Sequence, residues 1–218
     1  MTEHVTVELI DQGTAVREAL DESASSSRAS FLSKAVVAGG TLAVGGVLIS
    51  GLPGLAFAAP SAAHDADILN FALLLEYLES TFYNQAIASG KLKGETLSFA
   101  KTVAAHENAH VAFLKSALGS KAMKKPTFDF MGTTKDQSKF QATSVVLEDT
   151  GVSAYNGQGP NLTKKTLGAA AQIVSVEGRH AAWIRDILRM NPAPAAFDTP
   201  LTKAQVTAAV TKTGFIKS

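Results

Sequence analysis

Apolar residues recur every three or four positions along four long stretches of this chain, which is the spacing of one face of an α-helix. Strand-like alternation of apolar and polar residues is missing from the same region. We therefore predict four long helices, over about 65–88, about 95–118, about 135–156, and from just after Asn161 or Thr163 to Met190. A weaker periodic stretch at about 202–211 predicts a short extra C-terminal helix. The predicted fold class is all-α.

Glycine-containing breaks separate these helices and indicate how they are connected. Ser89-Gly90 follows the first helix, Gly119 the second, and a cluster over 157–160 the third. The first and last links are short, so each predicts an antiparallel helical hairpin. The middle link, 119–134, has about fifteen residues and can span on the order of 50 Å, against about 30 Å for a twenty-residue helix. A long crossover that makes the second and third helices parallel is therefore permitted.

One pattern of acidic and imidazole residues occurs twice: a lone glutamate on an apolar helix, then Glu-x-x-His on the next helix. The first copy is Glu76, Glu107 and His110, and the second is Glu148, Glu177 and His180. The sequence offset between the two lone glutamates is nearly the same as the offset between the two Glu-x-x-His motifs. The halves of the bundle are therefore interpreted as two copies of one hairpin, related by a pseudo-twofold axis.

This residue set is suited to binding two metal ions. Positions three apart on a helix lie on neighbouring turns of one face, so each Glu-x-x-His can hold one ion, and carboxylates can bridge ions about 3.5 to 4 Å apart. Four buried carboxylates without cations would repel each other and cost desolvation energy. Such ligand sets are typical of di-metal sites in four-helix bundles. We predict two ions, and iron and manganese both suit this donor set, which does not choose between them.

Two tyrosines accompany the repeat. Tyr83 and Tyr155 follow Glu76 and Glu148 at the same spacing of seven, and each is followed by asparagine. Because positions seven apart share a helix face, both phenols are expected near the site. Hydrogen bonding to a ligand carboxylate, electron donation and ordinary core packing all remain open for them.

Other polar residues near the motifs are not predicted to belong to the ligand set. Glu79 lies one turn from Glu76, but the tyrosine spacing favours Glu76, and Glu79 is expected to be a solvated or secondary residue. His106, whose counterpart in the second copy is Val176, is expected to be structural, and His64 is expected to be exposed. The glycosylation-type sequence 161–163 is interpreted as a helix cap.

Composition excludes several kinds of chemistry. The chain has no cysteine, so disulfides, thiolate zinc sites, iron–sulfur clusters and cysteine nucleophiles are excluded. Its 20 basic and 19 acidic residues give a net charge of +1, and the bases are dispersed. Nucleic acid is therefore not an expected partner.

The N-terminal region, 1–58, predicts an exported protein. Residues 1–27 are polar and serine-rich, and are expected to be disordered. An uncharged, glycine-rich apolar run follows Arg28 and Lys34 and ends in Ala-Phe-Ala at 56–58, the pattern of a cleavable signal. The sequence at 27–34 resembles a twin-arginine signal, except that Ala29 replaces the second arginine. We expect residues 1–58 to be this leader and 59–218 to be a periplasmic or other extracytoplasmic domain, with membrane anchoring as the alternative if residues 35–52 are retained.

Residues 64–190 resemble the ferritin-like domain family that includes plant desiccation-related proteins and exported bacterial homologues. The motifs LLLEYLESTFY, HENAHVAFL, LEDTGVSAY and VEGRHAAWI carry this resemblance. It implies a ferritin-like four-helix bundle with a long crossover, in which the six residues of the repeated pattern are iron ligands.

Three functions follow from this resemblance and the ligand set. The first is a di-iron oxidase-type protein that oxidises Fe(II) or removes peroxide in stress protection, with oxygen or peroxide as its partner. The second is a non-enzymatic stress or envelope protein in which the metal is structural or absent. The third is a cage that stores mineral. Enzymatic activity, catalytic residues and oligomeric state are left unassigned.

Overall fold

The computed structural model describes residues 60–217, so the leader, export signal and anchor expected within residues 1–58 lie outside the described residues. Five α-helices make up most of the described chain: α3 (Ala62–Ala88), α4 (Gly94–Leu118), α5 (Gln137–Gln158), α6 (Lys164–Ile187) and α7 (Lys203–Thr213). In this part of the chain, no helix is both long enough and apolar enough to cross a membrane.

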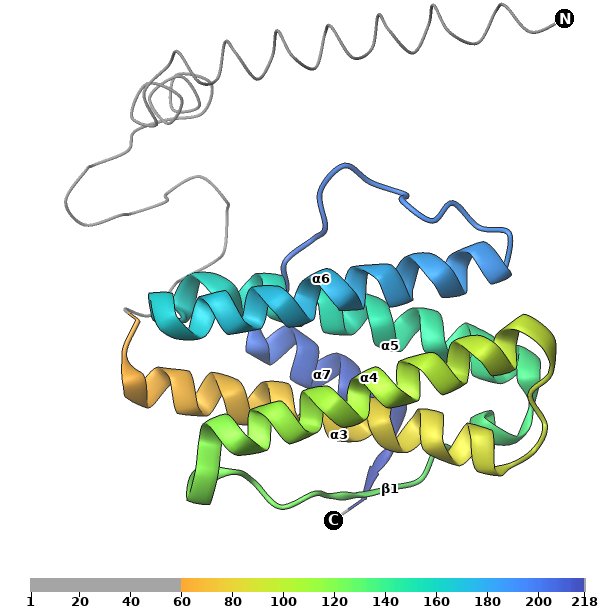
Figure 1. The fold of residues 1–218 in the computed structure, drawn as a ribbon, viewed down its shortest axis with the longest axis horizontal. Coiled ribbons are helices and arrows are strands. Elements are labelled where there is room, and N and C mark those ends of the chain that lie inside the picture. The colour runs from red at the N-terminus through yellow and green to blue at the C-terminus, as the bar shows by residue number, and fades with distance from the viewer. Residues whose placement is uncertain (1–59, 218) are drawn as a thin grey trace, which may run out of the picture. The chain divides into compact units, whose positions relative to one another are not determined.

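The four long helices form one bundle of two antiparallel hairpins, α3 with α4 and α5 with α6 (Figure 1). The connection from α4 to α5 returns along the length of the bundle, so that these two helices run in the same direction (Figure 1). It contains the 3₁₀ turns η1 (Gly119–Lys121) and η2 (Thr133–Lys135) and the short strand β1 (Thr127–Phe128). The predicted all-α bundle with a long crossover is confirmed.

The helix ends differ from the prediction by a few positions. The α3 helix begins at Ala62, slightly earlier than predicted, because the Ser61 side chain accepts a hydrogen bond from the His64 amide. The α5 helix begins at Gln137, after Asp136 caps it in the same way. The α6 helix ends at Ile187, before the predicted Met190, and Arg189 has a left-handed φ of 58° that cannot continue a helix.

The start of α6 is capped from another helix. Thr163 rather than Asn161 is the N-cap residue, but its own side chain makes no cap hydrogen bond. Instead, Asp65 of α3 accepts hydrogen bonds from the Thr163 amide at 2.9 Å and from the Thr163 and Thr166 hydroxyls. Burial acts to raise the pKa of Asp65, but these hydrogen bonds outweigh it and hold the pKa below its usual value. The charged carboxylate therefore ties the first hairpin to the second at the positive end of α6.

The crossover is held by the C-terminal end of the chain. Strand β1 pairs antiparallel with β2 (Ile216–Lys217), in the register Thr127↔Lys217 and Phe128↔Ile216. The Asp129 amide also donates to the Phe215 carbonyl at 2.8 Å. This two-stranded sheet was not predicted, because such short strands carry no detectable sequence periodicity.

An aromatic cluster fills the bundle beside the site described below. Phe82 lies parallel to Phe140 at 5.1 Å between ring centres, and Tyr83 meets Phe99 and Phe140 edge to face. Phe130, from the crossover, packs edge-on against Phe82. Fully buried rings in such contacts have little freedom to move, so the Tyr83 hydroxyl is held in one place.

Gly157, near the end of α5, allows the chain before α7 to lie directly on this helix. A Cβ atom at Gly157 would fall 1.8 Å from the Leu201 carbonyl oxygen, and the Leu201 amide donates to the Ser153 carbonyl at 3.0 Å. Only glycine permits this approach of two backbones.

We predict that Gly157→Ala lowers the free energy of unfolding by about 1–3 kcal/mol, because α7 must move away from α5. The matched control is Gly168→Ala in α6, where an added Cβ meets nothing within 4 Å. It should raise the free energy by roughly 0.5–1 kcal/mol through helix propensity. Denaturant unfolding of both variants measures the difference, and equal stabilities would contradict the proposed role of the close approach.

Candidate metal centre

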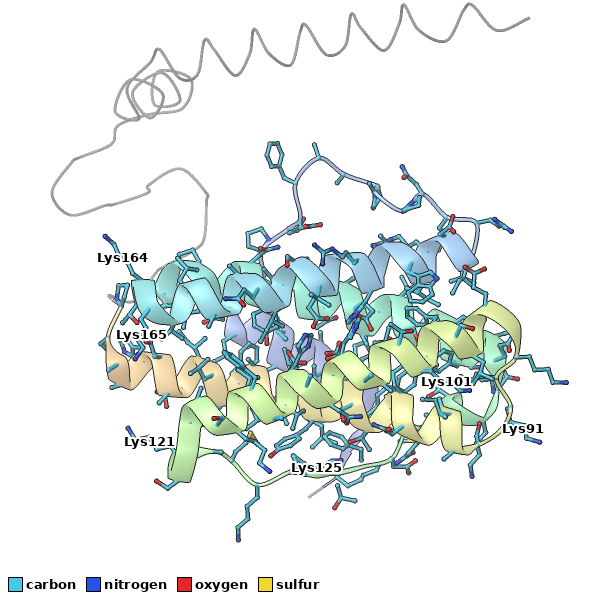
Figure 2. The ribbon with its side chains drawn as sticks, viewed as in Figure 1. Lys91, Lys101, Lys121, Lys125, Lys164 and Lys165 are labelled. Atoms are coloured by element: carbon cyan, nitrogen blue, oxygen red, sulfur yellow. The ribbon has the colours of Figure 1, made fainter. Side chains whose placement is uncertain are left out.

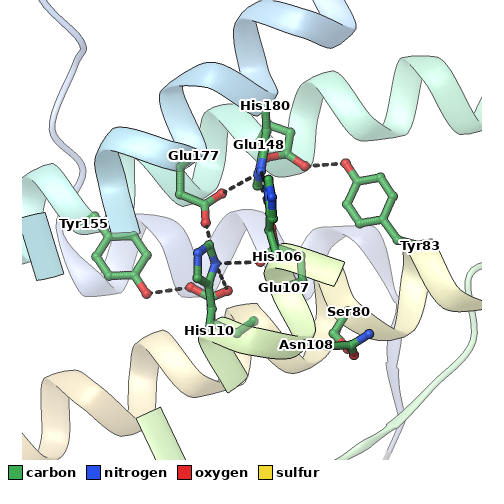
Figure 3. A network of polar contacts seen from close by, with 11 residues as sticks. Ser80, Tyr83, His106, Glu107, Asn108, His110, Glu148, Tyr155, Glu177 and His180 are labelled. Carbon is green, nitrogen blue, oxygen red and sulfur yellow. Dashed lines mark hydrogen bonds and ion pairs between the residues drawn. The ribbon is translucent and has the colours of Figure 1, made fainter. Parts of the chain in front are cut away.

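The six residues of the repeated pattern meet inside the bundle, between its two hairpins. Figure 3 labels all of them except Glu76. The helices α3 and α5 each place one glutamate there, Glu76 and Glu148, and α4 and α6 each place a Glu-x-x-His. The four glutamates and His180 have at most 2% of their surface exposed, and the side chain of His110 has 12%. The structure therefore brings all six candidates together, whereas their role as metal ligands stays a prediction.

Their ligand atoms form two overlapping groups, in each of which the atoms lie within 4.8 Å of one another. We call the first group, Glu76, Glu107, His110 and Glu177, the first position; the second position is Glu107, Glu148, Glu177 and His180. Glu107 and Glu177 belong to both positions. Ions at both positions would share these two carboxylates, and each of the other four residues would contact one ion.

Both imidazoles direct the same nitrogen, Nδ1, toward the carboxylates. His110 Nδ1 lies 3.2 Å from Glu76 Oε2, 3.2 Å from Glu107 Oε2 and 3.1 Å from Glu177 Oε1. His180 Nδ1 lies 3.2 Å from Glu107 Oε1 and 3.2 Å from Glu148 Oε2. The second nitrogen of each ring, Nε2, is therefore left for contacts outside the cluster.

The hydroxyl groups of both tyrosines bind glutamates of the cluster, and Figure 3 shows the contact between Tyr83 and Glu148. The Tyr83 hydroxyl donates to Glu148 Oε1, and the Tyr155 hydroxyl donates to Glu76 Oε1 at 2.5 Å. Each phenol thus binds the glutamate of the other copy, and not the one that precedes it on its own helix. This leaves the opposite oxygen, Oε2, of each glutamate facing the imidazoles.

Several donor atoms of the cluster are buried without a hydrogen-bond partner: Glu107 Oε1, Glu148 Oε2, both carboxylate oxygens of Glu177, and His180 Nδ1. Their ion-pair contacts of 3.1 to 3.6 Å are close, but they do not meet hydrogen-bond geometry. Buried polar atoms in folded proteins are otherwise nearly all hydrogen-bonded. Oxygen and imidazole nitrogen atoms that converge in this way fit a divalent iron or manganese ion.

The protonation of the metal-free cluster follows from burial and mutual repulsion. Burial, followed by the neighbouring acids, raises the pKa of Glu76 well above its usual value and that of Glu148 to about 8. Burial alone would lower the pKa of His110 and His180, but the adjacent carboxylates outweigh it and raise both to about 12. Metal binding through these residues must therefore displace protons from the cluster.

The positive charge that faces these carboxylates comes from the two imidazoles. Within residues 60–217, the four glutamates of the cluster form ion pairs with His110 and His180 alone. Of the lysines labelled in Figure 2, Lys91, Lys121, Lys164 and Lys165 lie toward the two ends of the bundle and Lys125 lies on the crossover. Lys101, within α4, is exposed. No lysine or arginine ion pair in the described chain therefore competes with a metal ion for the cluster.

Glu79 corrects one expectation. It is only 3% exposed, so it is not solvated, and it forms a fifth buried carboxylate beside the cluster. Its counterpart in the second copy of the repeat is Gly151, whose added Cβ would lie 3.5 Å from Glu79 Oε1 and 3.6 Å from Glu177 Oε2. In the sequence, the missing counterpart argued against Glu79 as a member of the cluster. In the structure, the lack of a side chain at Gly151 leaves space for the Glu79 carboxylate.

His106 also contacts the cluster, which its interpretation as a structural residue missed. Its Nδ1 lies 2.9 Å from Nε2 of His180, the nitrogen that faces away from the carboxylates. With His110, His180 and Trp183 it lines a cavity of about 430 Å³ between α4 and α6. The available signal was its spacing, because His106 precedes His110 by one helical turn and shares its face of the helix. His64 is exposed at the start of α3, as expected.

The geometry defines a class of protein: a ferritin-like four-helix bundle with a buried cluster of carboxylates and imidazoles that could hold metal ions. A sequence profile of the ferritin-like domain matches residues 64–190, and the chain belongs to this family. No curated protein sequence matches the chain. The predicted family is thereby confirmed, whereas the identity and number of the metal ions remain predictions.

We predict that Glu79→Gln stabilises the metal-free protein at pH 8 and has little effect at pH 4. Burial, and then Glu177 and Glu148, raise the pKa of Glu79 well above 4.5, so above pH 4.5 the folded chain keeps a proton that the unfolded chain loses. The contribution of Glu79 to the free energy of unfolding therefore falls as pH rises above 4.5. Glutamine does not ionise, so the variant does not suffer this loss. Each unit by which the folded-state pKa exceeds the unfolded-state pKa can lower the free energy of unfolding by up to about 1.4 kcal/mol at high pH.

Thermal melting of the chelator-treated protein between pH 4 and pH 8 measures this effect. The control is Glu95→Gln, since Glu95 is exposed and a glutamine can still accept the hydrogen bond from Trp183 Nε1. A Glu79→Gln protein that melts below the native protein at pH 8 would contradict the electrostatic account.

Proposed function

We propose that this protein is an exported di-iron carboxylate protein that oxidises Fe(II) or removes peroxide outside the cytoplasm in protection against stress. The observation that carries the proposal is the set of buried carboxylate and imidazole atoms that lack hydrogen-bond partners and converge on two adjacent positions. Family membership supports the fold but not a particular activity, because one fold can host several functions.

The residues of the cluster would have different roles in binding the ions. Glu107 and Glu177 would bridge, and His110 and His180 would bind through Nδ1, one at each position. Tyr155 and Tyr83 fix one oxygen of each terminal glutamate and so orient the other toward the ion. Bound iron would supply the capacity to pass electrons to oxygen or peroxide.

The cavity between α4 and α6 supports access for small molecules. It has a volume of about 430 Å³ and is lined by both imidazoles of the cluster, with Arg179 and Trp183 among the other lining residues. On the side of Tyr83, the aromatic cluster around Phe82 and Phe140 is tightly packed. Oxygen or peroxide is therefore expected to arrive between α4 and α6.

Anaerobic loading of the metal-free full chain with Fe(II), followed by air or peroxide, tests the function. We expect about two irons per chain, and consumption of the oxidant together with ferric absorbance. Glu107→Gln and Glu177→Gln, which each alter a bridging carboxylate, should lower the rate at least tenfold, whereas Glu95→Gln should not.

The remaining outcomes separate the alternatives. Two bound ions with no consumption of oxygen or peroxide would show a structural metal and overturn the oxidase proposal. If the iron-loaded protein consumes no oxidant but the manganese-loaded protein does, the active metal is manganese and not iron. A protein that takes up neither iron, manganese nor zinc would refute metal binding altogether.

The export proposal is supported by the sequence of the N-terminal region, 1–58, and has its own test. We expect the full chain, expressed in a bacterium with both general and twin-arginine export, to be recovered outside the cytoplasm with a new N-terminus near Ala59. Replacing Arg28 and Lys34 with glutamine should leave the uncut chain in the cytoplasm. Recovery of the uncut native chain from the cytoplasm would refute export, and recovery from the membrane would indicate the anchor.

A further inference from the structure

We propose that His106 is a positioning residue for His180 and that, by holding this imidazole, it makes the second metal position bind more tightly than the first. The inference rests on the proposed metal binding and extends it, because it assigns an order of loading to two positions that share the same ligand types.

The contact between the two rings has the geometry of an in-plane hydrogen bond. His106 Nδ1 and His180 Nε2 are 2.9 Å apart, the ring planes differ by 16°, and the ring centres are 5.1 Å apart. The ring centres are much farther apart than the two nitrogens because the rings meet edge to edge, as a nitrogen–nitrogen hydrogen bond requires. One ring must donate and the other must accept.

Metal binding decides which ring donates. His180 directs Nδ1 toward Glu107 and Glu148, so an ion at the second position takes the lone pair of Nδ1. The neutral ring then carries its proton on Nε2, which donates to Nδ1 of His106. His106 thereby favours the tautomer and the ring orientation that the ion needs.

The first position lacks this arrangement. The residue in the second copy that corresponds to His106 is Val176, which lines the same cavity as His110 and has no hydrogen-bonding group in its side chain. The tyrosine contacts are matched between the positions, and both bridging carboxylates are shared. Glu79 also breaks the repeat. The acids that act on it most are Glu177, which both positions share, and then Glu148 of the second position, so its negative charge is a separate difference between the two positions.

Outer contacts to a metal-binding histidine usually change metal affinity by about 10- to 100-fold. The first ion is therefore expected to occupy the second position, with Glu148 and His180, and the next ion to occupy the first position, with Glu76 and His110. The two binding steps should differ in dissociation constant by about the same factor.

Titration of the metal-free full chain with Co²⁺ in the absence of oxygen, followed by visible absorption, tests this order. The native chain should bind two ions in two resolved steps. His106→Val, which copies the second half of the repeat, should weaken the tighter step by about 10- to 100-fold and still bind two ions. His106→Asn should retain the tighter step, because its Oδ1 is as many bonds from Cα as the histidine Nδ1 and also accepts a hydrogen bond.

Three further variants control for location and for general damage to the site. Glu76→Gln should remove the weaker step, whereas Glu148→Gln should remove the tighter one, which identifies the position that His106 supports. Thr102→Val alters another lining residue of the cavity and should change neither step.

Equal binding steps in the native chain, or two steps that His106→Val leaves unchanged, would overturn the role of His106 and leave di-metal binding intact. Loss of the tighter step in Glu76→Gln instead of Glu148→Gln would overturn the assigned position. A native chain that binds no Co²⁺, Fe²⁺ or Mn²⁺ would overturn both this inference and the proposed function.

Discussion

The dominant constraint on this structure is the burial of five glutamates in one apolar bundle. Four of them surround two imidazoles, and Glu79 lies beside them. Like charges this close in a medium of low dielectric repel strongly, so the metal-free cluster must retain protons on its acids and imidazoles. Buried groups with strongly shifted pKa values are typical of functional sites, and this cluster could hold metal ions.

The rest of the fold holds this cluster in place. Asp65 ties the first hairpin to α6, the aromatic residues around Phe82 fix the Tyr83 hydroxyl, and Gly157 admits the chain before α7 against α5. The aromatic residues touch the cluster through Tyr83, which binds Oε1 of Glu148 and leaves Oε2 facing His180. Rigid support of this kind is what a ligand set needs in order to bind with defined geometry.

The internal repeat explains both the symmetry of the centre and its departures from symmetry. Duplicate hairpins supply matched ligands and place each tyrosine on the glutamate of the other copy. Two residues of the first copy that lie at the cluster have no equivalent side chain in the second copy. His106 stands where the second copy has Val176, and Glu79 stands where it has Gly151. Departures from a repeat carry little weight in the sequence, but in the structure both lie against the cluster.

By itself the sequence determined the class of fold, the helix order and the six residues that meet in the centre, because helical periodicity and repeat spacing are local properties of the chain. The length of the middle link permitted the crossover, and the family resemblance implied it. Only the tertiary structure decided that Tyr83 binds Glu148, that Asp65 caps α6, that Glu79 is buried and that His106 meets His180. Each of these depends on how two different helices face each other. Side-chain partners across a bundle are set by packing, which one helix's periodicity does not specify.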